Sequence, residues 1–330
     1  MVTTMKWIAA ELHTHTCHSD GTFTTQGLCG AAKAAGLSAI AITDHNTTAP
    51  LLELQPGLPD GSVAVIRGIE WTTFWGHLCI LGGTLDVDWR DASPGNMPQK
   101  LNDIRESGGI CGIAHPFAVG SPMCTGCHWS FGITDFSAIT YLEAWSEQFP
   151  CVRCECRRAV DFWVSLLDRG YRIAVTYGRD WHGEDTDGLP RACTCLRVDG
   201  EINAENALDA VARRRTAVTM GPLFWMETAG GAGSGDVASP GRLALVFRID
   251  RSFRREQWDR YNIQTRRLQV LGEGGRLLWE AGAGSDVTEI RKTLYVTGKY
   301  VRAQLVGTVC GQEAVIAMCT PVFLEDGGGI

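Results

Sequence analysis

Short apolar runs alternate with longer amphipathic segments over the first two thirds of the chain. Apolar runs with the length of buried strands occur at residues 7–12, 39–43, 63–66, 109–114, 138–142, 171–176 and 216–220. Segments with the spacing of helices occur at residues 24–36, 99–107, 154–169 and 204–214. A strand, a helix and a second strand in this order form a right-handed parallel unit, so the sequence predicts a parallel β/α architecture.

The pattern changes at about residue 224. Residues 230–235 are rich in glycine and turn-prone. Short β-like runs separated by Gly and Asp follow at residues 243–247, 268–271, 293–296 and 300–305. Such runs are typical of an antiparallel sheet or sandwich. We therefore predict two domains, a β/α unit over residues 1–224 and a small β-domain over 225–330 that packs on it and carries no second active site.

Side chains that can bind a metal follow one predicted strand after another. His13 and His15 leave the first strand on the same side of the extended chain, and the turn Ser19-Asp20-Gly21 comes next. The later strands run out into residues of the same kind, namely His45, Glu70, His77, His115, Glu143, Asp180 and His182. In parallel β/α folds the chemistry gathers at the carboxyl ends of the strands. The sequence therefore predicts one metal site there.

Each of these residues also has an ordinary structural interpretation. His45 can cap a helix, His115 can be a turn residue before Pro116, and Glu70 can pair with Arg67. Several such endings at one edge of a sheet are poorly explained by independent structural roles, so we favour the site.

Composition narrows the class of protein. With 330 residues, 45% hydrophobic and 20% charged, the chain is typical of a soluble globular protein, and its formal charge of −7 argues against a general nucleic-acid binder. A small anionic substrate fits this charge, because a bound metal supplies local positive charge. We find no apolar run of membrane-spanning length and no secretory leader, and we expect a cytoplasmic protein that does not associate with membranes.

Thirteen cysteines, an odd number scattered along the chain, argue against a secreted disulfide framework. Cys124 and Cys127 form one Cys-x-x-Cys pair, and Cys151 and Cys154 form another, followed by Cys156. Four such thiolates can hold a structural zinc. We favour the alternative that most of the thiols are buried and reduced.

Several motifs together resemble the PHP (polymerase and histidinol phosphatase) metallohydrolases: Leu12-His13-Thr14-His15 with Ser19-Asp20-Gly21, Ile42-Thr43-Asp44-His45-Asn46-Thr47, Gly68-Ile69-Glu70, Ala114-His115-Pro116 and Gly178-Arg179-Asp180-Trp181-His182. Two further segments resemble the CehA/McbA-like branch: Glu70-Trp71-Thr72-Thr73 with Gly76-His77, and Cys319-Thr320-Pro321-Val322-Phe323. The resemblance covers essentially the whole chain. It implies an α/β fold with a distorted (β/α)7 barrel whose metals lie at the strand carboxyl ends.

The resemblance also implies two or three divalent metal ions. One metal would be bound by His13, His15, Glu70 and Asp180. A second would share Glu70 and add His77 and His115, and a third would take Asp20, His45 and His182. Such imidazole and carboxylate ligands suit Zn²⁺, Mn²⁺ or Fe²⁺.

The chemistry implied is hydrolysis of a small phosphate ester by a hydroxide that two cations share across Glu70. His182 or His115 could protonate the leaving group, a role that competes with metal binding. Arg179 replaces a small residue of the family. Its guanidinium could either bind a phosphate through two N–H groups at once or point into solvent.

Two other functions stay open. The same centre could hydrolyse an amide or a carbamate-type ester, which is the chemistry linked to CehA/McbA relatives. The chain could also be a metal-binding or interaction protein without activity, with the β-domain as its recognition surface. The complete set of ligand residues argues against this second alternative.

Overall fold

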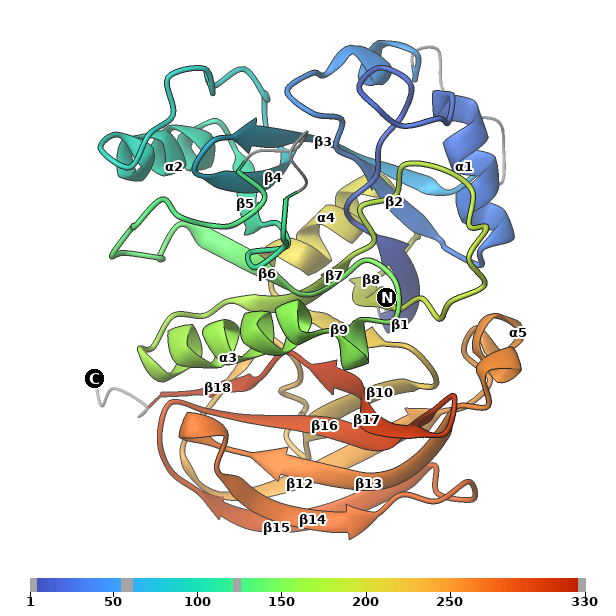
Figure 1. Ribbon diagram of the computed structural model, residues 1–330. Helices are drawn as coiled ribbons and strands as arrows, with labels where there is room; N and C mark the ends of the chain where they lie inside the picture. Colours follow the sequence, from blue (N-terminus) through green and yellow to red (C-terminus); the bar gives the residue numbers. More distant parts are fainter. Residues whose placement is uncertain (1–4, 55–61, 121–125, 326–330) are drawn as a thin grey trace.

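The computed structural model describes residues 5–54, 62–120 and 126–325, arranged as a strand-and-helix layer above a layer of strands (Figure 1). The upper layer is built on nine strands: β1 (Met5–Glu11), β2 (Ala39–Ile42), β3 (Ala64–Thr73), β4 (Gly76–Gly82), β5 (Gly109–Ile113), β6 (Ile139–Ser146), β7 (Ala174–Gly178), β8 (Cys193–Asp199) and β9 (Thr216–Thr219). Strands β1, β2 and β3 pair in parallel, as do β5, β6 and β7. Most of the predicted ligands lie at or beyond the carboxyl ends of these two parallel sets, whereas His77 stands at the start of the antiparallel strand β4.

The helices of this layer lie close to their predicted positions. They are α1 (Thr25–Ala34), α2 (Met97–Glu106), α3 (Cys154–Asp168) and α4 (Ala204–Ala212), with the short 3-10 turns η1 (Ala49–Leu52) and η2 (Pro150–Val152). The Thr24 hydroxyl accepts a hydrogen bond from the Gly27 amide and so caps α1. Helix α3 buries Cys156, Ala159, Trp163, Leu166 and Leu167, the three-to-four residue spacing of one helical face. Capping and periodicity thus explain why the helices could be placed from the sequence.

The mixed α/β fold is as expected, but the structure does not confirm a (β/α)7 barrel. A two-residue turn, Phe74-Trp75, joins β3 directly to the antiparallel strand β4, with no helix between them. Strand β8, which the apolar pattern did not indicate, pairs antiparallel with both β1 and β9. The assignment of residues 216–220 to a parallel unit was therefore wrong, because β8 precedes β9 as its antiparallel partner.

The outer edge of β7 is closed by side chains and not by a strand. Among the described residues β7 pairs only with β6. On its other side, the backbone amides of Val175 and Tyr177 donate to the hydroxyls of Thr320 and Thr194, each at 2.9 Å. The Thr216 hydroxyl donates to the Val175 carbonyl at 2.7 Å. Because buried amides and carbonyls need partners, these threonines satisfy an edge that would otherwise be unpaired.

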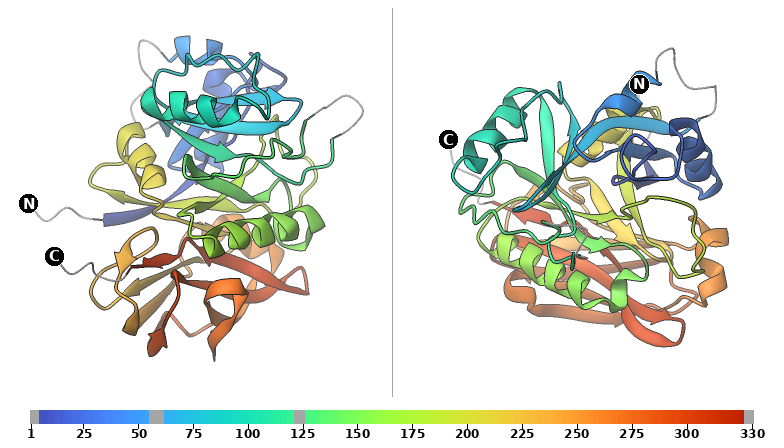
Figure 2. Two further views of the ribbon diagram at one scale, coloured as in Figure 1. Left: turned by 90° about the vertical axis from the view of Figure 1, so that its left-hand side faces the viewer. Right: turned by 45° about the horizontal axis from the view of Figure 1, so that its top comes forward.

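The C-terminal part is rich in antiparallel strands, as predicted. It contains β10 (Leu223–Thr228), β11 (Val237–Ala238), β12 (Gly241–Asp250), α5 (Arg255–Trp258), η3 (Asp259–Tyr261), β13 (Gln264–Leu271), η4 (Glu273–Gly275), β14 (Leu277–Gly282), β15 (Glu289–Val296), β16 (Tyr300–Val309), β17 (Gln312–Cys319) and β18 (Val322–Leu324). Strands β10, β12 and β15 form one sheet, and β13, β14, β16 and β17 belong to the large sheet. All of them lie below the helices of the upper layer (Figure 2).

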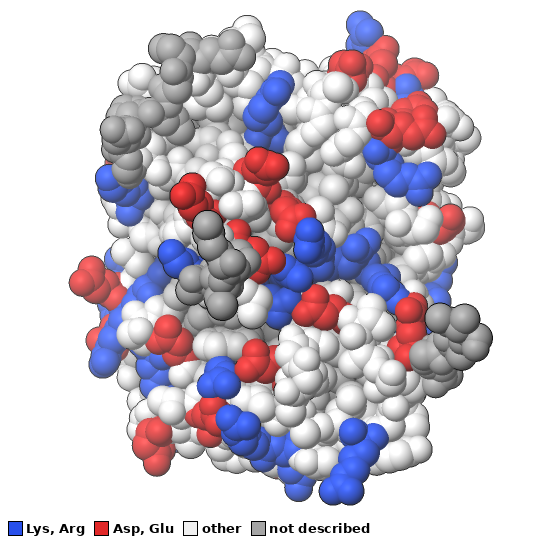
Figure 3. Space-filling view, turned by 180° about the vertical axis from the view of Figure 1, so that it is seen from behind, with Lys and Arg blue, Asp and Glu red and all other residues white. Residues whose placement is uncertain are grey.

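The two layers share one sheet. Strand β17 pairs antiparallel with β9, through Ala317 opposite Thr219 and Cys319 opposite Ala217. The boundary proposed at residue 224 falls within β10, near its start, and the division into two domains stays a prediction. Within the described part of the chain, no helix has the length and apolar character needed to cross a membrane. On the face seen in Figure 3, basic and acidic side chains are interspersed.

Candidate metal centre

The extension of β1 pairs with the segment after β7, and this pairing brings four predicted ligands together. The Trp181 amide donates to the His13 carbonyl at 3.1 Å, and the His15 amide donates to the Trp181 carbonyl at 3.0 Å. Alternation along these paired segments turns His13, His15 and Asp180 toward one another. Asp180 adopts a left-handed backbone, with φ of 52°. Such strain in a non-glycine residue is common where a site fixes the side chain.

The first group consists of His13, His15, Glu70 and Asp180, as predicted. The Nε2 atoms of His13 and His15 lie 3.3 and 3.0 Å from the Asp180 Oδ1 atom, and 3.2 and 3.5 Å from the Glu70 Oε2 atom. The side chains of His13, His15 and Glu70 are fully buried. Among the described residues, His13 Nε2, His15 Nε2, Glu70 Oε2 and Asp180 Oδ1 make no well-formed hydrogen bond, although His45 Nδ1 lies 2.7 Å from Glu70 Oε2. Buried polar atoms that converge without hydrogen bonds fit a divalent cation.

The second group shares Glu70 with the first. The other Glu70 oxygen, Oε1, lies 2.9 Å from His77 Nδ1 and 3.3 Å from His115 Nε2. His77 lies opposite Thr72 in the β3–β4 hairpin, two residues from Glu70, so the antiparallel pairing sets the contact. One carboxylate oxygen therefore faces each group, which is the arrangement of a bridging ligand.

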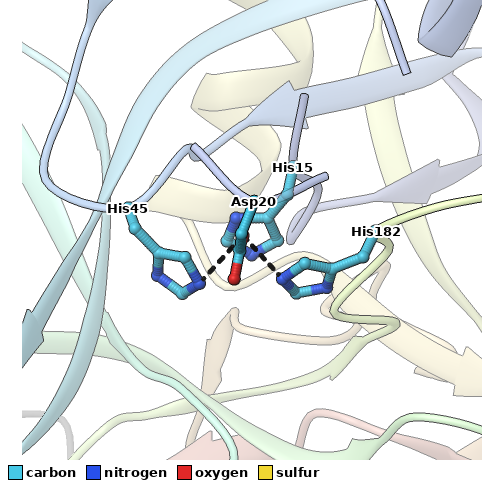
Figure 4. Close-up of side chains that lie close together, drawn as sticks. All are labelled: His15, Asp20, His45 and His182. Carbon is cyan, nitrogen blue, oxygen red and sulfur yellow. Dashed lines mark ion pairs between the residues drawn. The ribbon is translucent and has the colours of Figure 1, made fainter. Parts of the chain in front are cut away.

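The third group is the predicted set Asp20, His45 and His182, with His15 in addition (Figure 4). The Asp20 Oδ1 atom lies 3.4 Å from His45 Nε2 and 3.0 Å from His182 Nε2. The His15 ring centroid lies 4.3 Å from that of His45 and 4.1 Å from that of His182. The sequence assigned His15 to the first group only. The side chains of Asp20, His45 and His182 are 60%, 23% and 34% exposed, so this end of the centre is open.

Glu143 supports the first two groups, a role that the sequence did not reveal. Its Oε1 atom lies 2.9 Å from His13 Nδ1, and its Oε2 atom accepts a hydrogen bond from the His115 amide at 2.8 Å. A Cβ at Gly178 would lie 2.1 Å from the Glu143 carboxyl carbon, so only glycine leaves room for this side chain. A carboxylate on the second nitrogen fixes the tautomer and orientation of a metal-binding histidine. The sign in the sequence was the position of Glu143 after a strand, among the other candidates.

Glu11 is a second buried carboxyl beside the centre. It accepts hydrogen bonds from the amides of His13 and Arg179, at 3.0 and 2.9 Å. Burial raises its pKa to about 8, although these hydrogen bonds oppose the rise. Glu11 therefore links the segment that begins at His13 to the segment that begins at Arg179.

The charges of the centre balance one another. Burial alone would raise the pKa of Glu70, but the charge of His13 and hydrogen bonds from neighbouring histidines hold it well below its usual range. Burial opposes the charged form of His115, yet its hydrogen bond to Glu70 and the nearby Asp180 raise its pKa to about 9. Without a metal, protonated imidazoles balance the negative charge of the carboxylates, a role that bound cations would take over.

Arg179 lies beside the centre but is already paired. Its guanidinium lies over the Trp181 ring, 3.5 Å from the ring centroid, and forms an ion pair with Asp185. The side chain is only 9% exposed, so it does not turn out to solvent. It borders a cavity of about 260 Å³ that Asp180, His182 and Arg191 also line. The catalytic role expected for Arg179 stays a prediction.

The cysteines of the two Cys-x-x-Cys pairs do not form a metal cluster in the part of the chain that is described, although Cys79 lies in a buried group with His13 and Glu143. Cys124 lies outside the described residues. The groups of side chains placed to hold a metal do not include Cys127, Cys151, Cys154 or Cys156. Burial raises the pKa of Cys151 to about 12, which suits an inert thiol.

Comparison with known proteins agrees with this arrangement. Residues 11–85 match the PHP domain family, and this stretch contains six of the predicted ligands: His13, His15, Asp20, His45, Glu70 and His77. Over 81 residues the chain is 33% identical to the 5'-3' exoribonuclease Rnm of Escherichia coli, covering 23% of the chain and 28% of that protein. These findings support the PHP superfamily.

The fold extends the likeness beyond the PHP match. A two-domain protein from Bacteroides vulgatus, containing a predicted PHP-like metal-dependent phosphoesterase, has a similar structure. The TM-score is 0.51 at 15% identity, with 95% of each chain covered. At this identity the similarity concerns the fold, including the presence of a part beyond the PHP segment.

Proposed function

We propose that the chain is a metal-dependent phosphoesterase of the PHP superfamily that hydrolyses a small phosphate ester. The observation that carries the proposal is the position of Glu70, whose two carboxylate oxygens face two groups of buried histidines. His13, His15 and Asp180 would hold one cation with Glu70, and His77 and His115 a second. Asp20, His45 and His182 would hold a third. The CehA/McbA-like motifs make that branch our proposed place for the chain, and the cytoplasm its proposed location.

When bound, divalent cations activate water and neutralise charge on the ester oxygens. The residues of the chain prepare the place for this chemistry. Glu143 orients His13, and the paired segments at His15 and Trp181 fix the distances between ligands. His182 lies at the open end, where a leaving group can receive a proton. Burial of Glu70 and both histidines of the first group excludes water from the back of the centre.

The pairing of Arg179 with Asp185 favours a second candidate, hydrolysis of an amide or a carbamate-type ester. If Arg179 stays paired, no side chain at this position is free to recognise the additional charge of a phosphate. The two candidates differ in the atom attacked, phosphorus or carbon, while the same ligands are used.

One experiment separates these functions. The metal content of the protein purified without chelator is measured together with hydrolysis of p-nitrophenyl phosphate and p-nitrophenyl acetate, in the wild type and in Glu70→Gln. Glu205→Gln is the matched control, because Glu205 is exposed on α4, away from the centre. We expect two or three metals per chain, phosphatase activity, and the loss of both in Glu70→Gln alone. Acetate hydrolysis without phosphate hydrolysis would favour the second candidate, and bound metal without turnover of either ester would favour a binding protein.

A further inference from the structure

A second cavity lies between the two layers, away from the metal centre. It has a volume of about 490 Å³ and is bounded above by η2 and α3 and below by β16 and β17. Helix α3 runs along the top of these C-terminal strands (Figure 1). None of the residues that line this cavity belongs to the three ligand groups. It is therefore a separate place for a small molecule.

One side of the interlayer cavity is apolar. Its apolar walls come from both layers and consist of Trp145, Pro150, Val152, Val160, Val315 and Met318. Val152 remains 37% exposed, although it borders a concave surface. A largely apolar hollow with a few polar groups at its border is the usual form of a small-molecule site.

Two exposed, oppositely charged residues of α3 border the cavity. Arg157 and Asp161 lie one helical turn apart on α3 and both line the cavity. Among the described residues, neither side chain forms an ion pair or a side-chain hydrogen bond. Glu313, on the opposite wall, is already paired with Arg267 at 2.8 Å. The cavity therefore offers one positive and one negative charge that have no partner.

We propose that this cavity binds an apolar α-amino acid. The carboxylate would pair with Arg157, the ammonium with Asp161, and the apolar side chain would fill the space between α3 and β17. A simple apolar anion would leave Asp161 without a partner, and an apolar cation would leave Arg157 without one. Residues one turn apart on a helix have Cβ atoms about 5–6 Å apart, and the long Arg157 side chain can close this separation so that both charges reach groups on one carbon. The proposal does not depend on the reaction at the metal centre.

The test is calorimetric titration of the full chain with three probes that share a phenylethyl group. L-Phenylalanine carries both an ammonium and a carboxylate, 3-phenylpropionate only the carboxylate, and 2-phenylethylamine only the ammonium. We expect L-phenylalanine to bind more tightly than either analogue. Arg157→Gln should weaken L-phenylalanine and 3-phenylpropionate about fivefold and leave 2-phenylethylamine unchanged, since the pair is partly exposed. Asp161→Asn should show the reverse selectivity for the two analogues.

Two further variants keep the result decisive. Arg158→Gln is the matched control, because Arg158 is the next residue of α3 but lies over the Phe117 ring and outside the cavity. Val160→Trp should fill the apolar wall and abolish binding of all three probes, while circular dichroism confirms that the variant is folded. The proposal is overturned if L-phenylalanine does not bind, if either analogue binds as tightly as L-phenylalanine, or if Arg157→Gln and Asp161→Asn behave like Arg158→Gln.

Discussion

The two ends of the metal centre differ in how the chain holds them. Around Glu70, the candidate ligands stand in strands β3 and β4 or shortly after β1, β5 and β7. All of them except Asp180 are almost fully buried, and Glu143 contacts two of them, His13 and His115. Around Asp20, the ligands stand in loops, and the Asp20 side chain is 60% exposed. We therefore expect the buried end to bind its cations before a substrate arrives, and the open end to adjust to the substrate.

His15 lies between the two ends, so its replacement should have the largest effect. Because its ring is close to both groups, His15→Gln should release cations from both and lower hydrolysis about a thousand-fold. Metal content and ester hydrolysis measure this. His18→Gln is the control, since His18 pairs with Glu53 outside the centre. Loss of the third cation alone would show that His15 belongs to the open end only.

Replacing Glu143 tests whether its contacts with His13 and His115 strengthen cation binding at the buried end. Glu143→Gln should weaken cation binding there about 10- to 100-fold, the usual effect of removing a carboxylate that orients a histidine. Gly178→Ala should act in the same direction, because the new Cβ displaces Glu143. The control is Gly282→Ala, where a Cβ meets no atom within 4 Å. Cation affinity measured by competition with a chelating dye would remain unchanged if Glu143 has no such role.

The pKa of His115 predicts how cation binding at the buried end depends on pH. In the metal-free protein this pKa is raised to about 9, so the imidazole is protonated at pH 7 and must lose its proton before it can bind a metal. Cation affinity should therefore increase with pH, about tenfold for each unit between pH 7 and 9 for one released proton. Proton release on addition of Zn²⁺ measures this. Release that is the same in His115→Gln as in the wild type would contradict the assignment.

The smallest effect is expected at the open end. Asp20→Asn should lower hydrolysis only about fivefold, because an exposed carboxylate interacts weakly in water. The metal content should fall by one cation per chain at most, and the cations at Glu70 should stay. If Asp20→Asn removed all cations, the two ends would be one cooperative unit and the comparison would be wrong.

The sequence indicated which candidate ligands lie together more successfully than it indicated how the strands between them are connected and paired. His13, His15 and Glu70 could be placed together because each follows a short apolar strand, and this rule does not depend on the strand order. The turn between β3 and β4 could not be recognised, since residues 64–82 contain few of the breakers that mark turns. Strand β8 begins with Cys-Thr-Cys and contains only two large apolar residues, Leu196 and Val198, and this mixed pattern concealed its antiparallel pairing with β1.

Contacts behind the ligands were also beyond sequence reasoning. Glu143 was visible as a residue at a strand end, but its contact with His13 joins two side chains 130 positions apart in the chain, whose atoms lie 2.9 Å from each other. The same holds for Arg179. The sequence could offer only a phosphate or solvent as its partner, and Asp185 takes that place in the structure. The contact of Glu143 with His13 follows from long-range packing, and the pair of Arg179 with Asp185 follows from the course of a single loop, so neither is given by the local pattern.

The threonines that satisfy the outer edge of β7, Thr194, Thr216 and Thr320, have a consequence for the stability of the chain. Thr320 belongs to the last segment of the C-terminal part, yet it satisfies the amide of Val175 in the metal-bearing layer, and β17 continues the sheet from β9. Removal of the C-terminal part would leave these backbone groups without partners and expose a sheet edge. The two layers should therefore unfold in a single cooperative transition, and the slowest amide hydrogens to exchange should include those of both β7 and β17.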